Sequence, residues 1–414
     1  MASSRRALGI VAFFMLLTTL ASNAPSPLYA LYQQRFHLSA LGVTGVFAAY
    51  AGGVMVALFV IGGLSDAVGR RRVLAPALLL IGVSAVLFAV ADGVGWLYAA
   101  RGVQGLATGG ITGAATAALV ELEPSGDRQR ASYLNTLMYV SGAAVGPLLF
   151  GFLAQFAPWP LHLPFLLELG LVAVALVAVR ALPETVTPEA RRPWRVQRPS
   201  VPRPILGPFV LAVLALSVAW GVGGLYAALS PTIDRQLLHV HSDAAAGAIL
   251  FVFAAVGGIT QIALRRWPSW RSISVGVLGV AVGMSLVFWG EAAQVVALFL
   301  LGTLLTGSAS ALAFLGSLAL VNEVAPPARR AELVSAWNLV GYLSLSVPAI
   351  GVGLLSDAVG LQAATGIFTA VVAGLALVTA SAVLLAPRRP LDRLSDDELA
   401  ELGLNPAVAA SGLG

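Results

Sequence analysis

The chain reads GGLSDAVGRRRVL at residues 62–74, where two apolar runs, 40–63 and 73–91, meet. Each run is long enough to cross the ~30 Å hydrocarbon core of a bilayer, which takes about 20 helical residues. In the segment that joins them, Gly69 permits a sharp bend and one carboxylate, Asp66, faces three arginines. The stretch therefore predicts a tight polar turn between two membrane-spanning helices.

The composition extends this expectation to the whole chain. Of 414 residues, 58% are hydrophobic and 10% are charged, and the mean hydropathy is +0.89. A soluble protein carries about 25% charged residues, so the apolar excess is expected to face lipid. The pI near 10.0 does not indicate a nucleic-acid partner, because the arginines behind it are not gathered on one soluble face. Cysteine is absent, which excludes disulfides, thiolate metal sites and cysteine nucleophiles.

Polar breaks divide the chain into twelve apolar runs, six in each half. We expect spans at 7–30, 40–63, 73–91, 95–120, 131–155, 162–181, 206–229, 244–264, 272–290, 293–321, 332–355 and 362–386. The predicted fold class is an all-α integral membrane protein with twelve transmembrane helices in two pseudo-symmetric six-helix bundles. The predicted units are a first bundle (1–181), a cytoplasmic linker (182–205), a second bundle (206–386) and a cytoplasmic tail (387–414).

The arginines give this topology an orientation, since all 24 basic residues are arginine. With the N-terminus in the cytoplasm, Arg35 and Arg235 fall outside, Arg101 falls within a span, and the other 21 lie in cytoplasmic segments. Arginine-rich loops stay inside at insertion, so we expect a multi-pass protein of the cell (inner) membrane with both termini cytoplasmic. The run after Arg5 imitates a signal peptide, but Pro25 would follow the cut, and we read the run as an uncleaved first helix.

A faint repeat relates the two halves. Four residues in and before the fifth span recur 203 positions later around the eleventh: Pro124, Ser132, Asn135 and Tyr139 correspond to Pro327, Ser335, Asn338 and Tyr342. The offset is about half of the chain's length, as a duplicated six-helix unit produces. The fifth and eleventh spans are therefore expected to be equivalent.

The segment 62–74 resembles the signature loop between helices 2 and 3 of the major facilitator superfamily, in particular of its twelve-helix drug:proton antiporters. The family pattern is G-x-L-[AS]-D-[RK]-x-G-[RK]-[RK]-x-x-[LIV], and only Ala67 departs from it. The resemblance implies that the loop latches the two halves together on the cytoplasmic side, with its Asp acting on the N-terminus of helix 11. The gating residues that it implies are Gly62, Asp66, Gly69, Arg70 and Arg71.

A related hexapeptide, Leu355-Ser356-Asp357-Ala358-Val359-Gly360, repeats part of this loop after helix 11. The predicted topology places it on the outer side of the membrane. We interpret it as a turn that shares composition with the first loop, not as a second latch.

Helix 4 contains Arg101-Gly102-Val103-Gln104-Gly105, which is similar to the family's R-x-x-Q-G motif. The resemblance associates Arg101, Gln104 and Gly105 with proton coupling. An arginine this deep costs about 2.5–3.5 kcal/mol on insertion scales and should face a cavity or a partner. The alternative is that Arg101 is only a buried hydrogen-bonding anchor.

Helix 5 contains Gly142, Gly146, Pro147 and Gly151, in a pattern that resembles the family's antiporter motif with Phe150 as the one departure. The glycines permit close helix packing and the proline kinks the helix. The motif favours exporters over symporters.

A proton-coupled exporter needs a group whose protonation changes with the side of access. The family's drug antiporters often have an acid in helix 1, and this chain has none there. The one acid that we predict within a span is Glu168, which alternatively snorkels or bonds to a neighbour. Asp66 and Glu121, nearer the cytoplasm, and Asp234, outside, are further acids. The proton-coupling candidates are Arg101, Glu168 and Asp66.

The resemblance also implies that helices 1, 4, 7 and 10 line a central cavity, with helices 5 and 11 contributing. Aromatic side chains with a few polar groups suit a bulky amphipathic ligand, although any single aromatic residue can be a packing residue or an interface anchor. The substrate-cavity candidates are Asn23, Tyr29, Thr108, Asn135, Tyr139, Trp220, Tyr226, Trp337, Asn338 and Tyr342.

We expect no cofactor, no metal and no enzymatic activity. His239 and His241 near Asp243 could bind a metal, but two loop histidines are usually solvated. No G-x-x-x-x-G-K-[ST] loop is present, so an ion gradient is the expected energy source. The expected protein is a monomeric proton-coupled exporter of small amphipathic compounds that works by alternating access. The alternatives are a proton-coupled importer of a sugar or organic acid, and a membrane receptor that does not transport.

Overall fold

The computed structural model describes residues 2–187, 194, 200–238, 242–326 and 329–385, and it is helical throughout that part of the chain, without a strand. The first half contains α1 (Ala2–Asn23), α2 (Tyr29–Phe36), α3 (Ala40–Val60), α4 (Leu64–Val68), α5 (Arg70–Ala89), α6 (Val94–Leu122), α7 (Arg128–Phe156) and α8 (Leu163–Ala178). The second half contains α9 (Leu206–Gln236), α10 (Asp243–Ala263), α11 (Ser269–Ala293), α12 (Val296–Val324), α13 (Arg330–Val359) and α14 (Leu361–Leu385).

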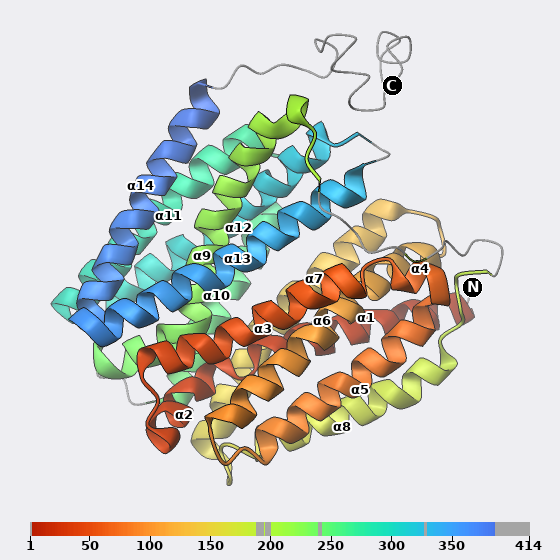
Figure 1. Ribbon diagram of the computed structural model, residues 1–414, viewed down its shortest axis with the longest axis horizontal. Coiled ribbons are helices and arrows are strands. Elements are labelled where there is room, and N and C mark those ends of the chain that lie inside the picture. The colour runs from red at the N-terminus through yellow and green to blue at the C-terminus, as the bar shows by residue number, and fades with distance from the viewer. Residues whose placement is uncertain (1, 188–193, 195–199, 239–241, 327–328, 386–414) are drawn as a thin grey trace.

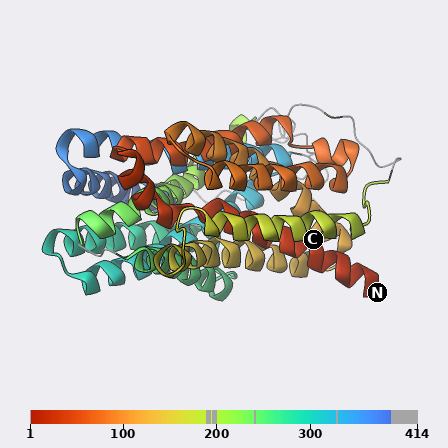
Figure 2. The ribbon, with the colours of Figure 1, turned by 90° about the horizontal axis from the view of Figure 1, so that it is seen from below.

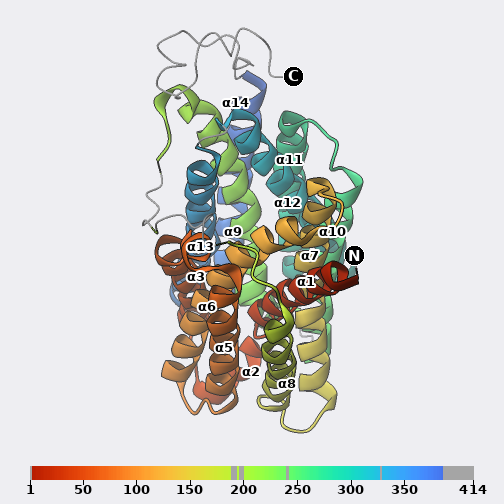
Figure 3. The same ribbon diagram turned by 90° about the vertical axis from the view of Figure 1, so that its right-hand side faces the viewer.

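Twelve of these segments are long and apolar enough to span a membrane. They form two bundles, α1–α8 in red to olive and α9–α14 in green to blue, which confirms the predicted fold class (Figures 1 and 3). Figure 2 shows that the helices of both bundles run along one common direction. The proposed unit boundaries stay predictions, because the middle of the linker (188–193 and 195–199) and all of the tail from residue 386 lie outside the described residues.

The first span is interrupted, because prolines break its hydrogen-bond ladder. Pro25 has no N–H to donate to the carbonyl of Ala21, and Pro27 has none for Asn23. α1 therefore ends at Asn23, a 3₁₀ turn follows over Ser26–Leu28, and the helix resumes as α2. The break exposes backbone carbonyls in the interior of the first bundle.

The helices define two ends of the molecule. The arginine-rich end contains the turns at 61–69, 123–127 and 264–268, and the arginine-poor end contains the turns at 37–39 and 90–93. Figure 1 shows the bundles side by side where α13 ends and α3 begins, at the arginine-poor end, and apart at the other ends of these two helices.

The close approaches between the bundles follow the same pattern. At the arginine-poor end, a Cβ on Gly353 of α13 would collide with the Thr44 hydroxyl of α3, and a Cβ on Gly151 of α7 would lie 2.5 Å from the Asp243 carbonyl of α10. Farther along the same pair of helices, Gly258 of α10 packs on Val140 of α7. Small residues thus bring the bundles together from the arginine-poor end to the middle of α7 and the last third of α10.

Candidate functional site

Arg101 lies in the interior of the first bundle, where it completes the broken end of α1. Only 1% of the residue is exposed. Its guanidinium donates to the carbonyl of Ser22 at 2.8 Å and to the side-chain oxygen of Gln104 at 2.5 Å, and the amide of Gln104 donates to the carbonyl of Ala21 at 2.9 Å. Pro25 has no N–H to donate to the carbonyl of Ala21. Two side chains of α6 therefore supply the hydrogen-bond donors that the break in the helix removes. The R-x-x-Q spacing therefore has a local structural role.

The same guanidinium faces the aromatic rings of α3. Its central carbon lies 4.5 Å from the ring centroid of Tyr50 and 5.5 Å from that of Phe47. Contacts of this kind stabilise a cation by about 0.5–2 kcal/mol. α3 and α6 approach closely here, since a Cβ on Gly105 of the predicted motif would collide with the Tyr50 carbonyl. The Nε atom of Arg101 has no hydrogen-bond partner.

Glu168 of α8 is the acidic counterpart of Arg101. It is fully buried, so it does not snorkel, and neither carboxylate oxygen has a hydrogen-bond partner. It lies within electrostatic range of Arg101. The hydroxyls of Tyr29 and Tyr32 are likewise buried without partners. The membrane-spanning interior of the first bundle thus contains a buried arginine, a buried carboxyl group and polar atoms without a hydrogen-bond partner.

The prediction that Glu168 is the one acid within a span was wrong, because two further acids without an arginine partner among the described residues, Asp234 and Glu291, are buried in the second bundle. α9 continues to Gln236, past the predicted end at 229, and Asp234 is 1% exposed. α11 continues to Ala293, and Glu291 is 3% exposed. The hydropathy pattern ended both predicted spans too early, at residues 229 and 290, so neither acid was counted.

Each of these two acids accepts a hydrogen bond from a hydroxyl group of the second bundle. Glu291 accepts from the Thr365 hydroxyl at 3.0 Å, and Asp234 accepts from the Ser230 hydroxyl at 3.3 Å while its other oxygen is unpartnered. Each acid is within electrostatic range of the other. Tyr226, a predicted cavity residue, lies within range of both.

At the arginine-rich end, Asp66 is paired inside its own bundle. Its carboxylate lies 2.5 Å from Arg70, whose guanidinium also contacts Glu121 at 2.7 Å and the Ser65 hydroxyl at 2.6 Å. The side chain of Asp66 is 46% exposed. In this conformation Asp66 is directed to Arg70, and within the described residues it makes no hydrogen bond or ion pair with the start of the eleventh span, α13, which the resemblance implies as its partner.

Gly69 of the same loop is required by its geometry. Its φ of 112° lies in the region that favours glycine, and a Cβ there would collide with the carboxylate of Glu184. That carboxylate caps the start of α5, accepting from the backbone N–H of Arg70 at 2.7 Å and of Arg71 at 3.3 Å. The start of α5 is thus capped by a residue that follows α8 in the chain, not by a side chain of the predicted turn. Gly62 precedes Gly69, in the α3–α4 turn.

The glycines of the α7 motif divide between two partners. A Cβ on Gly142 or Gly146 would collide with the backbone of α1, at Leu16 and Leu20. Gly151 instead packs on α10 in the other bundle, where Pro147 also contacts Gly247. One part of the motif therefore packs against α1, next to Arg101, and the other part packs against the second bundle.

A group of aromatic residues lies between the bundles. Tyr342 of α13 is within electrostatic range of Tyr50 of α3 and Tyr139 of α7, which are therefore close to one another. Tyr139 is 46% exposed although it lies near the middle of α7. The rings of Tyr342 and Trp220 meet edge to face at 5.1 Å between centroids. Arg101 contacts the ring of Tyr50, and Tyr50 lies within electrostatic range of Tyr342, so a path of neighbouring residues leads from Arg101 toward the aromatic residues of the second bundle.

The remaining cavity candidates are engaged within their own bundles. Asn23 donates to Thr19, Thr108 bonds to the Ser22 hydroxyl at 3.0 Å, and Asn135 accepts from Thr116. The Tyr226 hydroxyl bonds to Thr303, and the Trp337 indole donates to Ser317 at 2.7 Å. Asn338 is half-buried on α13. Of the ten candidates, the structure brings together Tyr139, Tyr342, Trp220 and Trp337, whose ring centroid lies 6.3 Å from that of Trp220.

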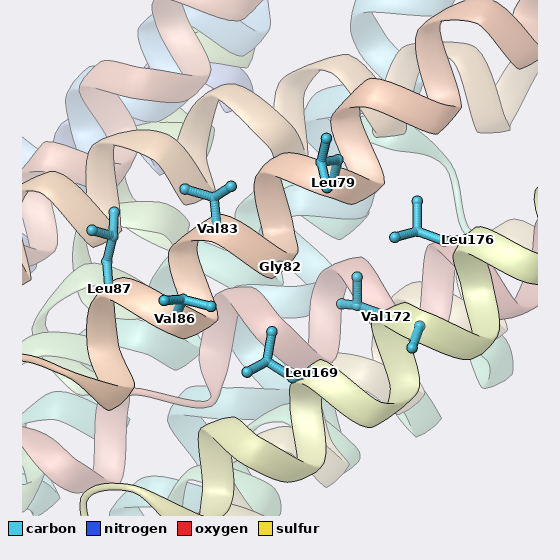
Figure 4. Close-up of a pocket in the computed structure, with 9 residues that line it drawn as sticks. Leu79, Gly82, Val83, Val86, Leu87, Leu169, Val172 and Leu176 are labelled. Carbon is cyan, nitrogen blue, oxygen red and sulfur yellow. The ribbon is translucent and has the colours of Figure 1, made fainter.

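Two other features stand apart from this site. A groove of about 370 Å³ between α5 and α8 is lined only by apolar residues such as Leu79, Val83 and Leu169 (Figure 4). Its composition suits lipid tails rather than a polar substrate. The pair His239 and His241, considered above as a metal site, lies outside the described residues.

The second hexapeptide does end in the predicted turn, at Gly360 between α13 and α14, but its aspartate also has a partner in the other bundle. Asp357 accepts hydrogen bonds from the backbone N–H groups of Ala40, at 3.0 Å, and Leu41, at 3.3 Å. It therefore joins α13 of the second bundle to α3 of the first. No local sequence signal could reveal this partner, which lies 317 residues away.

Known proteins share this architecture. Residues 11–347 match the family model of the Major Facilitator Superfamily. The chain is 27% identical over 300 residues to the putative multidrug resistance protein MdtD of Salmonella heidelberg, covering 68% of this chain and 57% of that protein. It is 33% identical over 153 residues to the puromycin resistance protein pur8 of Streptomyces alboniger, covering 36% of this chain and 29% of that protein.

A solved peptide transporter, POT, superimposes with a TM-score of 0.71 at 16% identity, covering 91% of this chain and 93% of that one. At this identity the likeness concerns the fold alone. The match to the family model, over most of the chain, concerns the family. The chain belongs to the Major Facilitator Superfamily.

Proposed function

We propose that the protein exports small amphipathic compounds from the cytoplasm in exchange for protons, by alternating access. The main support is the path from the buried Arg101 and Glu168 through Tyr50 to the aromatic residues between the bundles. An ion-binding group and a ligand surface that share a residue can influence each other's occupancy. The α7 motif and the two relatives named for drug resistance favour export.

We further propose that the arginine-rich end faces the cytoplasm, as the positive-inside tendency favours. The bundles contact each other at the opposite end, so this conformation is open to the cytoplasm. Tyr139 and Tyr342 then meet a substrate from that side.

In the proposed cycle Glu168 carries the proton. Burying a carboxyl group without hydrogen-bond donors costs less free energy when the group is protonated than when it is charged. When Glu168 is charged, the positive charge of Arg101 offsets part of this cost. Protonation of Glu168 leaves the Arg101 charge with Tyr50, Phe47 and the carbonyl of Ser22. The ring of Tyr50 in turn lies near Tyr139 and Tyr342, where the substrate binds.

Everted vesicles test this function, because they expose the arginine-rich end to the added compounds. With an acidified interior, we expect puromycin or a lipophilic cationic dye to accumulate and to dissipate the pH gradient as it does so. A protonophore and Glu168→Gln should each abolish accumulation, whereas Tyr133→Phe, at an exposed α7 position, should not. Uptake of a labelled sugar or peptide into right-side-out vesicles, driven by an inward proton gradient, would identify an importer instead.

A further inference from the structure

The hexapeptide Leu-Ser-Asp-Ala-Val-Gly occurs twice, at 64–69 and at 355–360. A glycine precedes the aspartate by four positions in both copies, as Gly62 and as Gly353. Seven residues at the same relative positions are therefore shared. The two copies belong to different bundles and lie at opposite ends of the molecule.

The two copies also have the same local structure. Each is helical up to its valine and ends at a glycine with positive φ, 112° at Gly69 and 88° at Gly360. The N–H of each of these glycines donates to the carbonyl of the serine four residues earlier, at 3.1 Å in both copies. Asp66 and Asp357 consequently occupy equivalent positions, each two residues before the last residue of a helix.

The helices that contain or precede these copies, α13 and α3, are antiparallel neighbours (Figure 1). α13 ends at the arginine-poor end, where α3 begins. α3 ends at the arginine-rich end, where α13 begins. The first hexapeptide thus follows α3 at the end of the molecule where α13 starts. The second forms the last residues of α13, at the end where α3 starts.

At the arginine-poor end the contact is made. The first amides of α3 have no helical acceptor, and Asp357 accepts from two of them, those of Ala40 and Leu41. Ser39 accepts from the next, that of Gly42, at 3.2 Å. A carboxylate at this position also interacts favourably with the helix dipole. The start of α3 is therefore capped jointly by its own serine and by an aspartate of the other bundle.

The absence of a side chain at Gly353 makes this contact possible. A Cβ there would collide with the Thr44 hydroxyl and would lie 3.0 Å from the Cα of Leu41 and 3.1 Å from the Ala40 carbonyl. One turn later Asp357 reaches the amides at the start of the same helix. At the arginine-rich end, by contrast, Asp66 pairs with Arg70 inside its own bundle.

We propose that Asp357 is a second latch, which holds the bundles together at the arginine-poor end and stabilises the conformation open at the arginine-rich end. Asp66 and Asp357 then act in turn. When the molecule opens at the arginine-poor end, Asp357 leaves α3 while Asp66 leaves Arg70 for the start of α13. The inference rests on alternating access and is independent of the substrate, the coupling ion and the direction of transport.

Distance measurements between spin labels test the latch directly. The chain has no cysteine, so pairs of introduced cysteines are the only sites labelled. Gln34 and Gln362 are exposed at the arginine-poor end, and Gln129 and Arg266 are exposed at the arginine-rich end. Electron–electron double resonance on each pair, in nanodiscs without substrate, gives the populations of the two open conformations. Both conformations must appear in the distance distributions of the unaltered protein.

We expect Asp357→Asn to lower the ratio of the arginine-rich-end-open to the arginine-poor-end-open conformation by about tenfold, the effect of losing a charged helix cap. The distance between labels at 34 and 362 should lengthen, and that between 129 and 266 should shorten. Asp92→Asn is the matched control, because it removes an exposed carboxylate from the same end. Asp66→Asn, which does not touch this contact, should leave the ratio unchanged or higher.

Gly353→Ala provides a second variant that leaves the carboxylate intact. Its Cβ should push α13 away from α3 and shift both distances in the same direction as Asp357→Asn does. Distributions for Asp357→Asn and Gly353→Ala that both superimpose on that of Asp92→Asn would overturn the latch. Because no substrate is present, a failure of the export proposal would leave these distances unaffected.

Discussion

The two bundles bury ionisable groups in different ways. In the first bundle, Arg101 and Glu168 are opposite charges within electrostatic range of each other but not in direct contact, and Arg101 is held by the Ser22 carbonyl, by Gln104 and by two aromatic rings. In the second bundle, Asp234 and Glu291 each accept from a hydroxyl group, of Ser230 and of Thr365, and neither has an arginine partner among the described residues. The nearest arginine along the chain, Arg235, is paired with Asp243.

This difference decides what each site tolerates. Removing one member of a buried ion pair leaves the other uncompensated, which costs about 3–5 kcal/mol. Burying two neighbouring carboxyls without a cation costs the least free energy when they are not both charged. A neutral amide is therefore a close substitute for one of them. The first bundle should therefore be sensitive to charge removal and the second should not.

The largest effect is expected from Arg101→Ala. The substitution leaves Glu168 and the carbonyl of Ser22 uncompensated, so we expect a loss of roughly 3–5 kcal/mol in the free energy of unfolding and a complete loss of transport. Unfolding in detergent, followed by tryptophan fluorescence, measures the first quantity and vesicle accumulation the second. Arg72→Ala, at an exposed arginine, should change stability by less than about 0.5 kcal/mol.

Adding Glu168→Gln to Arg101→Ala should restore part of the lost stability, because the uncompensated charge is then gone. If the losses of stability caused by the two substitutions simply add in the double variant, the two groups do not interact. The difference proposed here between the two bundles would then not exist.

The next effect concerns single carboxyls. Glu168→Gln should abolish proton-driven accumulation, while Asp234→Asn and Glu291→Gln should each change the free energy of unfolding by less than about 1.5 kcal/mol. Accumulation at several values of the pH gradient separates coupling from stability. If Glu291→Gln abolishes coupling and Glu168→Gln retains it, the proton site belongs to the second bundle.

The smallest effect is expected from the tyrosines that face each other between the bundles. Tyr139→Phe and Tyr342→Phe each remove one hydroxyl, so we expect a change in KM of a few-fold, equivalent to about 0.5–1.5 kcal/mol, without a change in stability. Tyr133→Phe is the control on the same helix. If the two substitutions have no effect on any transported compound, the substrate does not bind between these residues.

The membrane topology could be predicted because hydropathy and arginine placement act locally. A span of about 20 apolar residues must be helical to satisfy its backbone in lipid, whichever neighbours it has. The ends of the spans were less predictable. α9 continues past residue 229 because tertiary packing buries Asp234, and a hydropathy pattern treats the same aspartate as a sign of solvent.

The candidate site was predictable in part. The sequence of α6 indicated that Arg101 needs a partner, and the structure shows why Gln104 accompanies it, since Pro25 withdraws the donor that Ala21 would otherwise have. Glu168 could be selected because it was isolated in an apolar run. Tyr50 was not selected, because its role depends on the crossing of α3 and α6 at Gly105.

The sequence by itself determined the twelve spans, their division into two sets of six and the turn at each hexapeptide, because these follow from hydropathy, charge and glycine geometry along the chain. Tertiary structure alone decided which hexapeptide contacts the other bundle. Asp66 and Asp357 have the same neighbours in sequence, yet one meets an arginine of its own bundle and the other meets the start of α3. The partner of a carboxylate depends on which donors come within about 3 Å of it, and that distance is set by how the two bundles close.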